Sequence, residues 1–218
     1  MQDPDRATPY TEREERINAV THGVGLLLSL AGTALLVALA ATRGDTALVV
    51  GCAVFGASLV LLYGASTFYH GLRHAGAKRF LQKLDHAAIF VLIAGTYTPL
   101  TLVSLRDSIG AILLATVWSL ALFGITLQLV LPAYGRRLSI PLYLGMGWLA
   151  VMALEPLMES VRPGGLALLV AGGLAYTLGV VFYAWRSFPF NHAVWHGFVL
   201  LGSTCHFSCI LIYVIPSA

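Results

Sequence analysis

Two pairs of polar residues with helical spacing stand out in an otherwise apolar chain. Ser66 and His70 form one pair, His192 and His196 form the other, and the members of each pair are four positions apart. Residues at i and i+4 lie on one face of a helix, one turn apart. Three imidazoles that leave a coordination position for water are the ligand set of a catalytic zinc site. The sequence therefore predicts a Zn²⁺ site with His70, His192 and His196 as its ligands.

Two further side chains, Ser66 and Asp85, would act beside these ligands. Zinc lowers the pKa of a bound water toward about 7, so that a hydroxide nucleophile forms near neutral pH. Asp85 would hydrogen-bond a ligand imidazole or orient that water. Ser66 would stabilise a developing oxyanion or bond the same water. This combination indicates metal-assisted hydrolysis of an acyl bond, with Ser66 and Asp85 as the catalytic residues.

Other polar residues in apolar segments have plainer interpretations. We expect His206 to pack inside the protein, although together with Cys205 and Cys209 it would also suit a second soft-metal site. His86 fits two roles equally well, support of the metal site and contact with lipid headgroups. Glu155 lies near the end of an apolar run, where solvation at headgroup level is expected.

The composition identifies the class of protein that must position these residues. Of the 218 residues, 58% are hydrophobic and only 11% are charged, whereas soluble domains carry about 25% charged residues. About 20 apolar residues cross the hydrocarbon core of a bilayer, and a backbone in lipid satisfies its hydrogen bonds best as a helix. Seven runs are long enough to span: 17–41, 46–70, 86–105, 109–133, 139–158, 164–185 and 192–216. We therefore predict an all-α, polytopic membrane protein, with residues 1–16 as a cytoplasmic tail and 17–218 as a domain of seven transmembrane helices.

The basic residues predict the orientation of these helices. Ten Lys and Arg residues lie in the N-terminal tail and the second, fourth and sixth loops, against three in the loops on the opposite side. Because cytoplasmic loops are enriched in Lys and Arg, the N-terminus is expected inside. With this topology His22, Ser66, His70, Asp85 and the pair at 192 and 196 all fall at the cytoplasmic ends of their spans. The convergence of these groups at one depth supports the proposed site.

Five motifs then resemble those of a known family. They lie at 15–23 (ERINAVTHG), 66–70 (STFYH), 84–90 (LDHAAIF), 94–99 (AGTYTP) and 192–196 (HAVWH). The chain is similar over nearly its whole length to bacterial hemolysin III proteins, which belong with the progestin and adiponectin (PAQR) receptors. The resemblance implies seven helices, zinc held by His70, His192 and His196, and Ser66 and Asp85 close by. It also implies kinship with alkaline ceramidases, and hence hydrolysis of a lipid amide.

Three functions remain open on the sequence alone. The first is a zinc-dependent membrane hydrolase, or a lipid-homeostasis protein that uses the same site, in a bacterial inner membrane. The second is a channel-forming or cytolytic protein with a structural zinc, and the third is a sensor or receptor of membrane state. The expected partners are membrane lipids, including a lipid or fatty-acid substrate, and no nucleic acid. A retinal-based light-driven protein is excluded, because both lysines, Lys78 and Lys83, precede the third apolar run.

Overall fold

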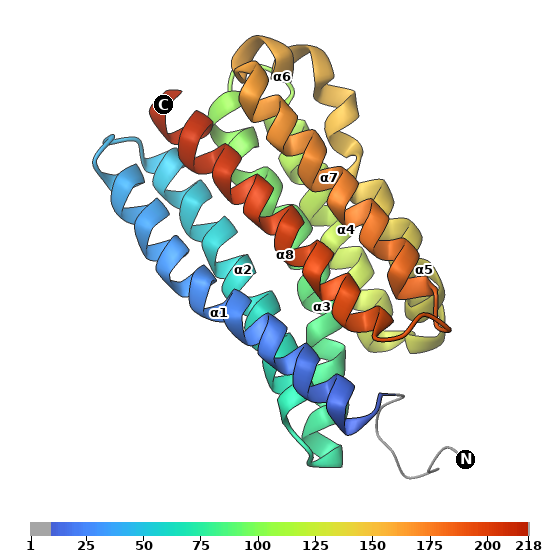
Figure 1. Ribbon diagram of the computed structural model, residues 1–218. Coiled ribbons are helices and arrows are strands. Elements are labelled where there is room, and N and C mark those ends of the chain that lie inside the picture. Colours follow the sequence, from blue (N-terminus) through green and yellow to red (C-terminus); the bar gives the residue numbers. More distant parts are fainter. Residues whose placement is uncertain (1–9, 218) are drawn as a thin grey trace.

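Seven apolar helical spans run side by side in the structure, a computed structural model that describes residues 10–217 (Figure 1). The helices are α1 (Glu12–Ala41), α2 (Thr46–Gly71), α3 (Ala75–Pro99), α4 (Gly110–Val130), α5 (Pro132–Gly147), α6 (Leu154–Ser160), α7 (Pro163–Ala184) and α8 (Asn191–Cys209). A π-helical turn, Leu100–Ser104, extends α3, and a 3₁₀ turn, Leu149–Ala153, joins α5 to α6 within the fifth span. The chain continues beyond α8 through a π-helical turn, Ile210–Val214, and a 3₁₀ turn, Ile215–Ser217. The prediction of an all-α protein with seven spans is confirmed, and its orientation in the membrane stays a prediction.

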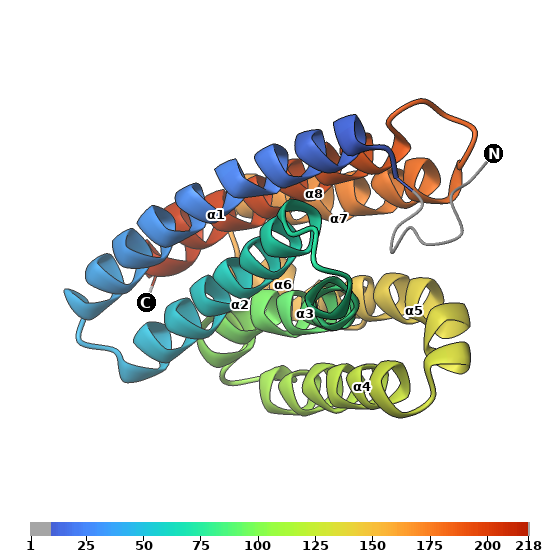
Figure 2. The same cartoon turned by 90° about the horizontal axis from the view of Figure 1, so that it is seen from below.

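Neighbouring spans pack in sequence order, and the last span returns to the first. Helix α1 packs on α2, α2 on α3, α3 on α4, and α7 on α8, while α1 also contacts α8. Figure 2 shows α1 lying along α8 on one side and close to α2 on the other. Helix α1 therefore lies against both of the helices that carry the predicted metal ligands.

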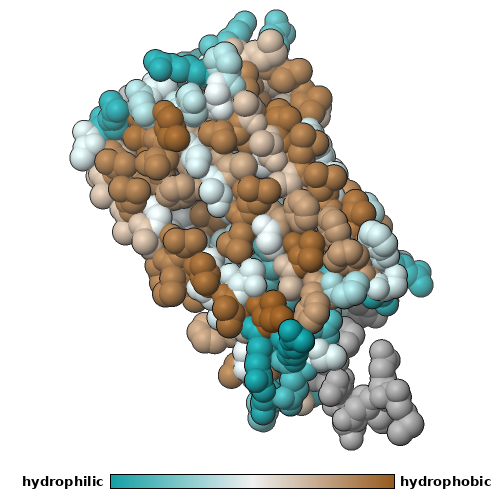
Figure 3. All heavy atoms as spheres, in the orientation of Figure 1, coloured by the Kyte–Doolittle hydropathy of each residue, from teal (hydrophilic) through white to brown (hydrophobic). Residues whose placement is uncertain are grey.

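Two apolar cores hold the bundle together, and α3 contributes to both. One core gathers buried side chains of α1, α2, α3 and α8, including Phe55 and Tyr63. The other lies between α3 and the helices α4 to α6 and includes Phe90 and Met146. The outer surface is also apolar: Figure 3 shows a broad hydrophobic belt with hydrophilic residues gathered at both ends. A soluble protein seldom exposes such a continuous apolar surface, whereas a bilayer requires it.

Two of the helices that reach the candidate site, α1 and α3, begin earlier than the hydrophobic runs predicted. Helix α1 begins at Glu12, five residues before the predicted run, because Thr11 and Glu14 form a reciprocal capping box. Helix α3 begins at Ala75 inside the segment that was predicted as a loop, because His74 caps it by accepting a hydrogen bond from the amide of Ala77. Polar first turns do not register as apolar runs, but their capping groups still start a helix. Both early turns carry residues that reach the candidate site.

Candidate metal centre

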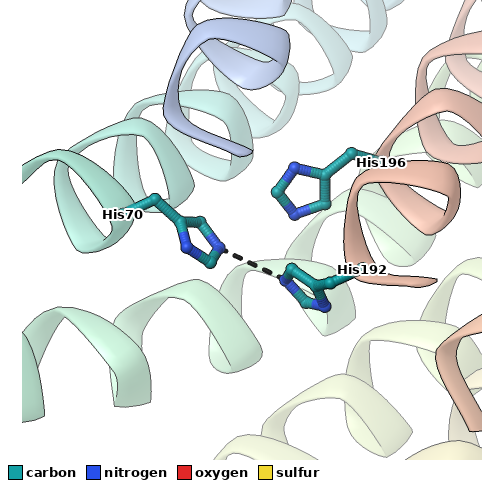
Figure 4. A group of neighbouring side chains, drawn as sticks. All are labelled: His70, His192 and His196. Carbon is teal, nitrogen blue, oxygen red and sulfur yellow. Dashed lines mark hydrogen bonds between the residues drawn. The ribbon is translucent and has the colours of Figure 1, made fainter. Parts of the chain in front are cut away.

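Three buried imidazoles converge from two helices at one end of the bundle. His70 is the next-to-last residue of α2, and His192 and His196 lie in the first two turns of α8. One ligand nitrogen from each ring lies within 4.8 Å of the others, and Figure 4 shows the rings facing one another across the gap between the helices. The sequence prediction that these three histidines come together is confirmed, although His70 is more than a hundred residues from the other two.

The spacing and chemistry of the three rings suit a metal such as zinc. Two nitrogens bound tetrahedrally at Zn–N distances of 2.0–2.1 Å would lie about 3.3 Å apart. Nε2 of His70 lies 3.2 Å from Nε2 of His192. Within the described residues, Nδ1 of His192 and Nδ1 of His196 are buried with no hydrogen-bond partner. Burying polar nitrogens that have no partner costs free energy. A cation bound between the three imidazoles would be such a partner. The identity of the metal is a proposal taken up below.

The start of α8 is fixed by contacts with the end of α7. Phe190, just before the helix, adopts a left-handed conformation with φ of 53°. Asn191 then donates its side-chain amide to the carbonyl oxygens of Phe182 and Tyr183, at 3.2 and 3.4 Å. Both carbonyls belong to the last turn of α7, where a helix runs out of backbone partners; that of Phe182 also accepts from the amide of Trp185 at 3.1 Å. The sharp turn and the cap together set the position of His192 one residue later.

Glu15 is part of the site, although the sequence analysis placed it in a cytoplasmic tail. Its Oε2 atom lies 2.7 Å from Nδ1 of His70 and 3.2 Å from Nζ of Lys78. The hydrogen bond to a ligand imidazole that was expected of Asp85 is thus made by Glu15. Lys78 was likewise expected in a solvated loop but is buried in the first turns of α3.

Ser66 and Asp85 lie next to each other in the buried interior. Ser66 lies one turn before His70 on α2, and Asp85 lies on the facing helix α3. Both are at least 90% buried, and the Ser66 hydroxyl lies beside the Asp85 carboxyl group. It does not reach hydrogen-bond geometry with any described residue, so it has a free hydrogen-bonding capacity. The two predicted catalytic residues are therefore adjacent, and their part in a reaction remains a proposal.

Aromatic rings from α1 and the residues before it lie on two of the ligand imidazoles. His22 stacks on His196 with ring centroids 3.5 Å apart and an angle of 10° between the planes. Tyr10 stacks on His192 at 4.7 Å and 28°. Tyr10 precedes the first span, and burial raises its pKa above the ordinary value, so its hydroxyl stays protonated. Asn18 is fully buried on the same face of α1.

The remaining polar residues do not join the cluster. His206 lies deeper in α8, where its Nε2 contacts the carbonyl oxygen of Leu169 at 3.3 Å, as expected for a packing residue. The described residues contain one group of His, Cys, Asp or Glu with metal-ligand spacing, and it includes neither Cys205 nor Cys209. His86 is partly exposed, and its backbone carbonyl accepts a hydrogen bond from Tyr143 at 2.8 Å.

A periodic signal could have identified the residues that were missed. Glu15, Asn18 and His22 are spaced i, i+3 and i+7, which places them on one face of a helix. The same face continues inward through Gly25 and Ser29, both buried. Continuing this polar face from His22 toward the N-terminus would have extended the predicted first helix into the tail. It would also have predicted that Glu15 faces the site.

Comparison with known proteins agrees with this arrangement. A family model described as Haemolysin-III related matches residues 10–207. The chain is 45% identical to the Hemolysin-3 homolog of Bacillus subtilis (strain 168), over 94% of this chain and 97% of that protein. It is 43% identical to Hemolysin-3 of Bacillus cereus, over 94% of each. A more distant relative, 26% identical over 94% of this chain and 86% of its own length, is the human monocyte to macrophage differentiation factor. The chain belongs to the haemolysin-III related family of integral membrane proteins with several transmembrane helices.

Proposed function

We propose that this protein is a zinc-dependent hydrolase that cleaves an acyl bond of a membrane lipid, with a lipid amide of the ceramide type as the leading substrate class. The observation that carries the proposal is the convergence of three buried imidazoles, from α2 and α8, beside the buried pair of Ser66 and Asp85. We place the protein in the inner membrane of a bacterium, with its N-terminus in the cytoplasm.

The donor set indicates which residues would hold the metal and which would remain for chemistry. His70, His192 and His196 would supply three nitrogens and leave a position open, whereas structural zinc sites are usually closed by four protein ligands. When bound, zinc in such a site polarises a carbonyl group and activates a water molecule. A substrate would enter from the bilayer, because the site lies inside an apolar bundle.

Ser66 and Asp85 would divide the remaining tasks between them. Asp85 is a carboxylate beside the site that would accept a proton from the attacking water and return it to the leaving amine. The Ser66 hydroxyl, which has no hydrogen-bond partner among the described residues, would donate to the oxyanion that develops on the carbonyl oxygen. Both roles require a polar group that is buried, as these two are.

The test separates the loss of metal from the loss of chemistry. Purified wild-type protein should carry about one zinc per chain, and His192→Ala should lose most of it. Ser66→Ala and Asp85→Asn should keep most of the zinc and lose at least ten-fold in hydrolysis of a ceramide-type amide, followed by mass spectrometry. His74→Asn is a matched control, because His74 is exposed and caps α3, and asparagine keeps the cap. If the hydrolytic activity of Ser66→Ala and Asp85→Asn falls only in proportion to their zinc content, these residues have no catalytic role of their own.

A second function is favoured by the names of two relatives. Proteins named Hemolysin-3 and Hemolysin-3 homolog are 43% and 45% identical to this chain over nearly its whole length. We therefore propose membrane permeabilisation, with zinc in a structural role, as the competing function. Dye release from lipid vesicles by wild-type protein, unchanged in Ser66→Ala, together with no amide hydrolysis, would favour it over the hydrolase.

A further inference from the structure

Glu15 makes a direct, charge-assisted contact with a candidate metal ligand. Its Oε2 atom accepts from Nδ1 of His70 at 2.7 Å, and the His70 side chain is fully buried. Because a carboxylate accepts and does not donate, this contact holds the proton of the ring on Nδ1. Nε2 is then the nitrogen with a free lone pair, and Nε2 is the atom that faces His192.

The carboxylate is itself held in place by a buried cation. Nζ of Lys78 lies 3.2 Å from Oε2 of Glu15 and donates to the carbonyl oxygens of Tyr69 and Leu72, at 2.8 and 3.3 Å. These carbonyls lie at the end of α2, next to His70. Lys78 thus ties the carboxylate of α1 to the turn of the chain that carries the ligand.

Glu15 differs from the other residues that contact the ligand rings. Tyr10 and His22 stack on His192 and His196 and limit the tilt of those rings. Stacking does not select which ring nitrogen carries the proton. In the described residues, His70 is the one ligand whose second nitrogen is hydrogen-bonded by a carboxylate.

We propose that Glu15 is a positioning residue of the metal centre, which orients His70 and fixes the tautomer that presents Nε2 to the ion. The inference rests on the proposed zinc site and deepens it. Carboxylate partners of metal-bound histidines raise ligand basicity and restrict ring orientation, and their loss typically weakens metal affinity 10–100-fold. A purely structural ion pair between α1 and α3 would instead affect stability and leave the affinity unchanged.

The experiment measures zinc affinity in detergent by competition with a chelator of known affinity. Glu15→Gln should bind Zn²⁺ 10–100-fold more weakly than wild type. Glu12→Gln is the matched control: Glu12 lies one turn away, is exposed, and pairs with Arg16 and Arg73 at 3.4 and 3.5 Å. Its affinity should stay within about two-fold of wild type, as for other exposed ion pairs. The visible spectrum of bound Co²⁺ gives a second readout, and it should change in Glu15→Gln and not in Glu12→Gln.

A second variant covers the case in which Glu15→Gln does not fold. The double variant Glu15→Gln/Lys78→Met removes both charges of the ion pair together, and it should show the same weakened zinc affinity. Wild-type affinity in either Glu15 variant would overturn the inference and leave the proposed function standing. A wild-type protein that takes up no zinc would overturn both.

Discussion

Replacing Lys78 by methionine should destabilise the folded protein more than any exposed substitution nearby. The Lys78 ammonium group has three acceptors: the Glu15 carboxylate and the carbonyl oxygens of Tyr69 and Leu72. The Lys78 and Glu15 side chains are only 8% and 13% exposed, so water does not replace a lost partner. Methionine keeps the apolar stem and removes the charge, so the Glu15 carboxylate loses its contact with the Lys78 ammonium group.

The size of the effect follows from this burial. Removing one partner of a buried ion pair typically costs 3–5 kcal/mol, and we expect about 3 kcal/mol here, at the low end of that range, because His70 still contacts the carboxylate. Glu15→Gln/Lys78→Met should be less destabilised than Lys78→Met alone, because the second change removes the carboxylate that has lost the Lys78 ammonium group. The two substitutions should therefore be coupled by about 1–3 kcal/mol.

The assay is a double-mutant cycle on the metal-free protein. The free energy of unfolding would be measured by denaturation in mixed detergent micelles for wild type, both single variants and the double variant. Lys83→Met, on the exposed side of the same helix, serves as the control and should change stability by less than about 0.5 kcal/mol. If the effects at Glu15 and Lys78 simply add, within about 0.5 kcal/mol, then the ion pair does not act as described.

Three further predictions concern other parts of the bundle. Accessibility tags should place the N-terminus in the cytoplasm and the C-terminus outside, and the topology would be wrong if both lay on one side. The Arg106 guanidinium, hydrogen-bonded to Asp45, holds the pKa of that carboxyl below its ordinary value; its stabilising effect is therefore present above about pH 4 and lost as the pH falls through the lower, folded-state pKa. Asp45→Asn keeps the helix cap, so its melting temperature should lie below that of wild type at pH 6 and approach it in acid, whereas a constant difference would argue against the pair. A Cβ at Gly25 would lie 2.6 Å from Cδ1 of Tyr63, so Gly25→Ala should lower the free energy of unfolding by about 1–3 kcal/mol. Gly197 has open space around it, so Gly197→Ala should have no such cost. Equal melting temperatures for the two variants would contradict the close packing at Gly25.

The spans and the metal ligands could be predicted because each leaves a local signal. Long apolar runs mark the helices, and an i, i+4 pair such as His192 and His196 shows its common face in the sequence itself. The positive charges then indicated that His70 shares the same end of the bundle. These inferences need only the period of a helix and the length of a span.

The partners of the ligands could not be predicted in the same way. Glu15 and Lys78 stand in polar, charged segments that look solvated in a linear sequence. Lys78 is buried and Glu15 is largely covered because capped helices begin there. Their contact also depends on how α1 crosses α2, which no local pattern specifies. Asp85 was expected to hydrogen-bond a ligand imidazole or orient the water because it stands at the start of the third apolar run. The carboxylate that contacts His70 is instead that of Glu15, in the polar segment before the first run.

The placement of α1 has a consequence for how the protein matures. The groups around the three imidazoles come from the first, second, third, sixth and last spans, and the second and last supply the imidazoles themselves. A ribosome making the chain inserts Glu15 and His70 long before His192 and His196 exist. Until α8 enters the bilayer and packs against α1, Glu15 and Lys78 lie beside one candidate ligand, His70. A single imidazole cannot chelate a metal ion. The three imidazoles can therefore meet only after α8 has been inserted and has packed against α1.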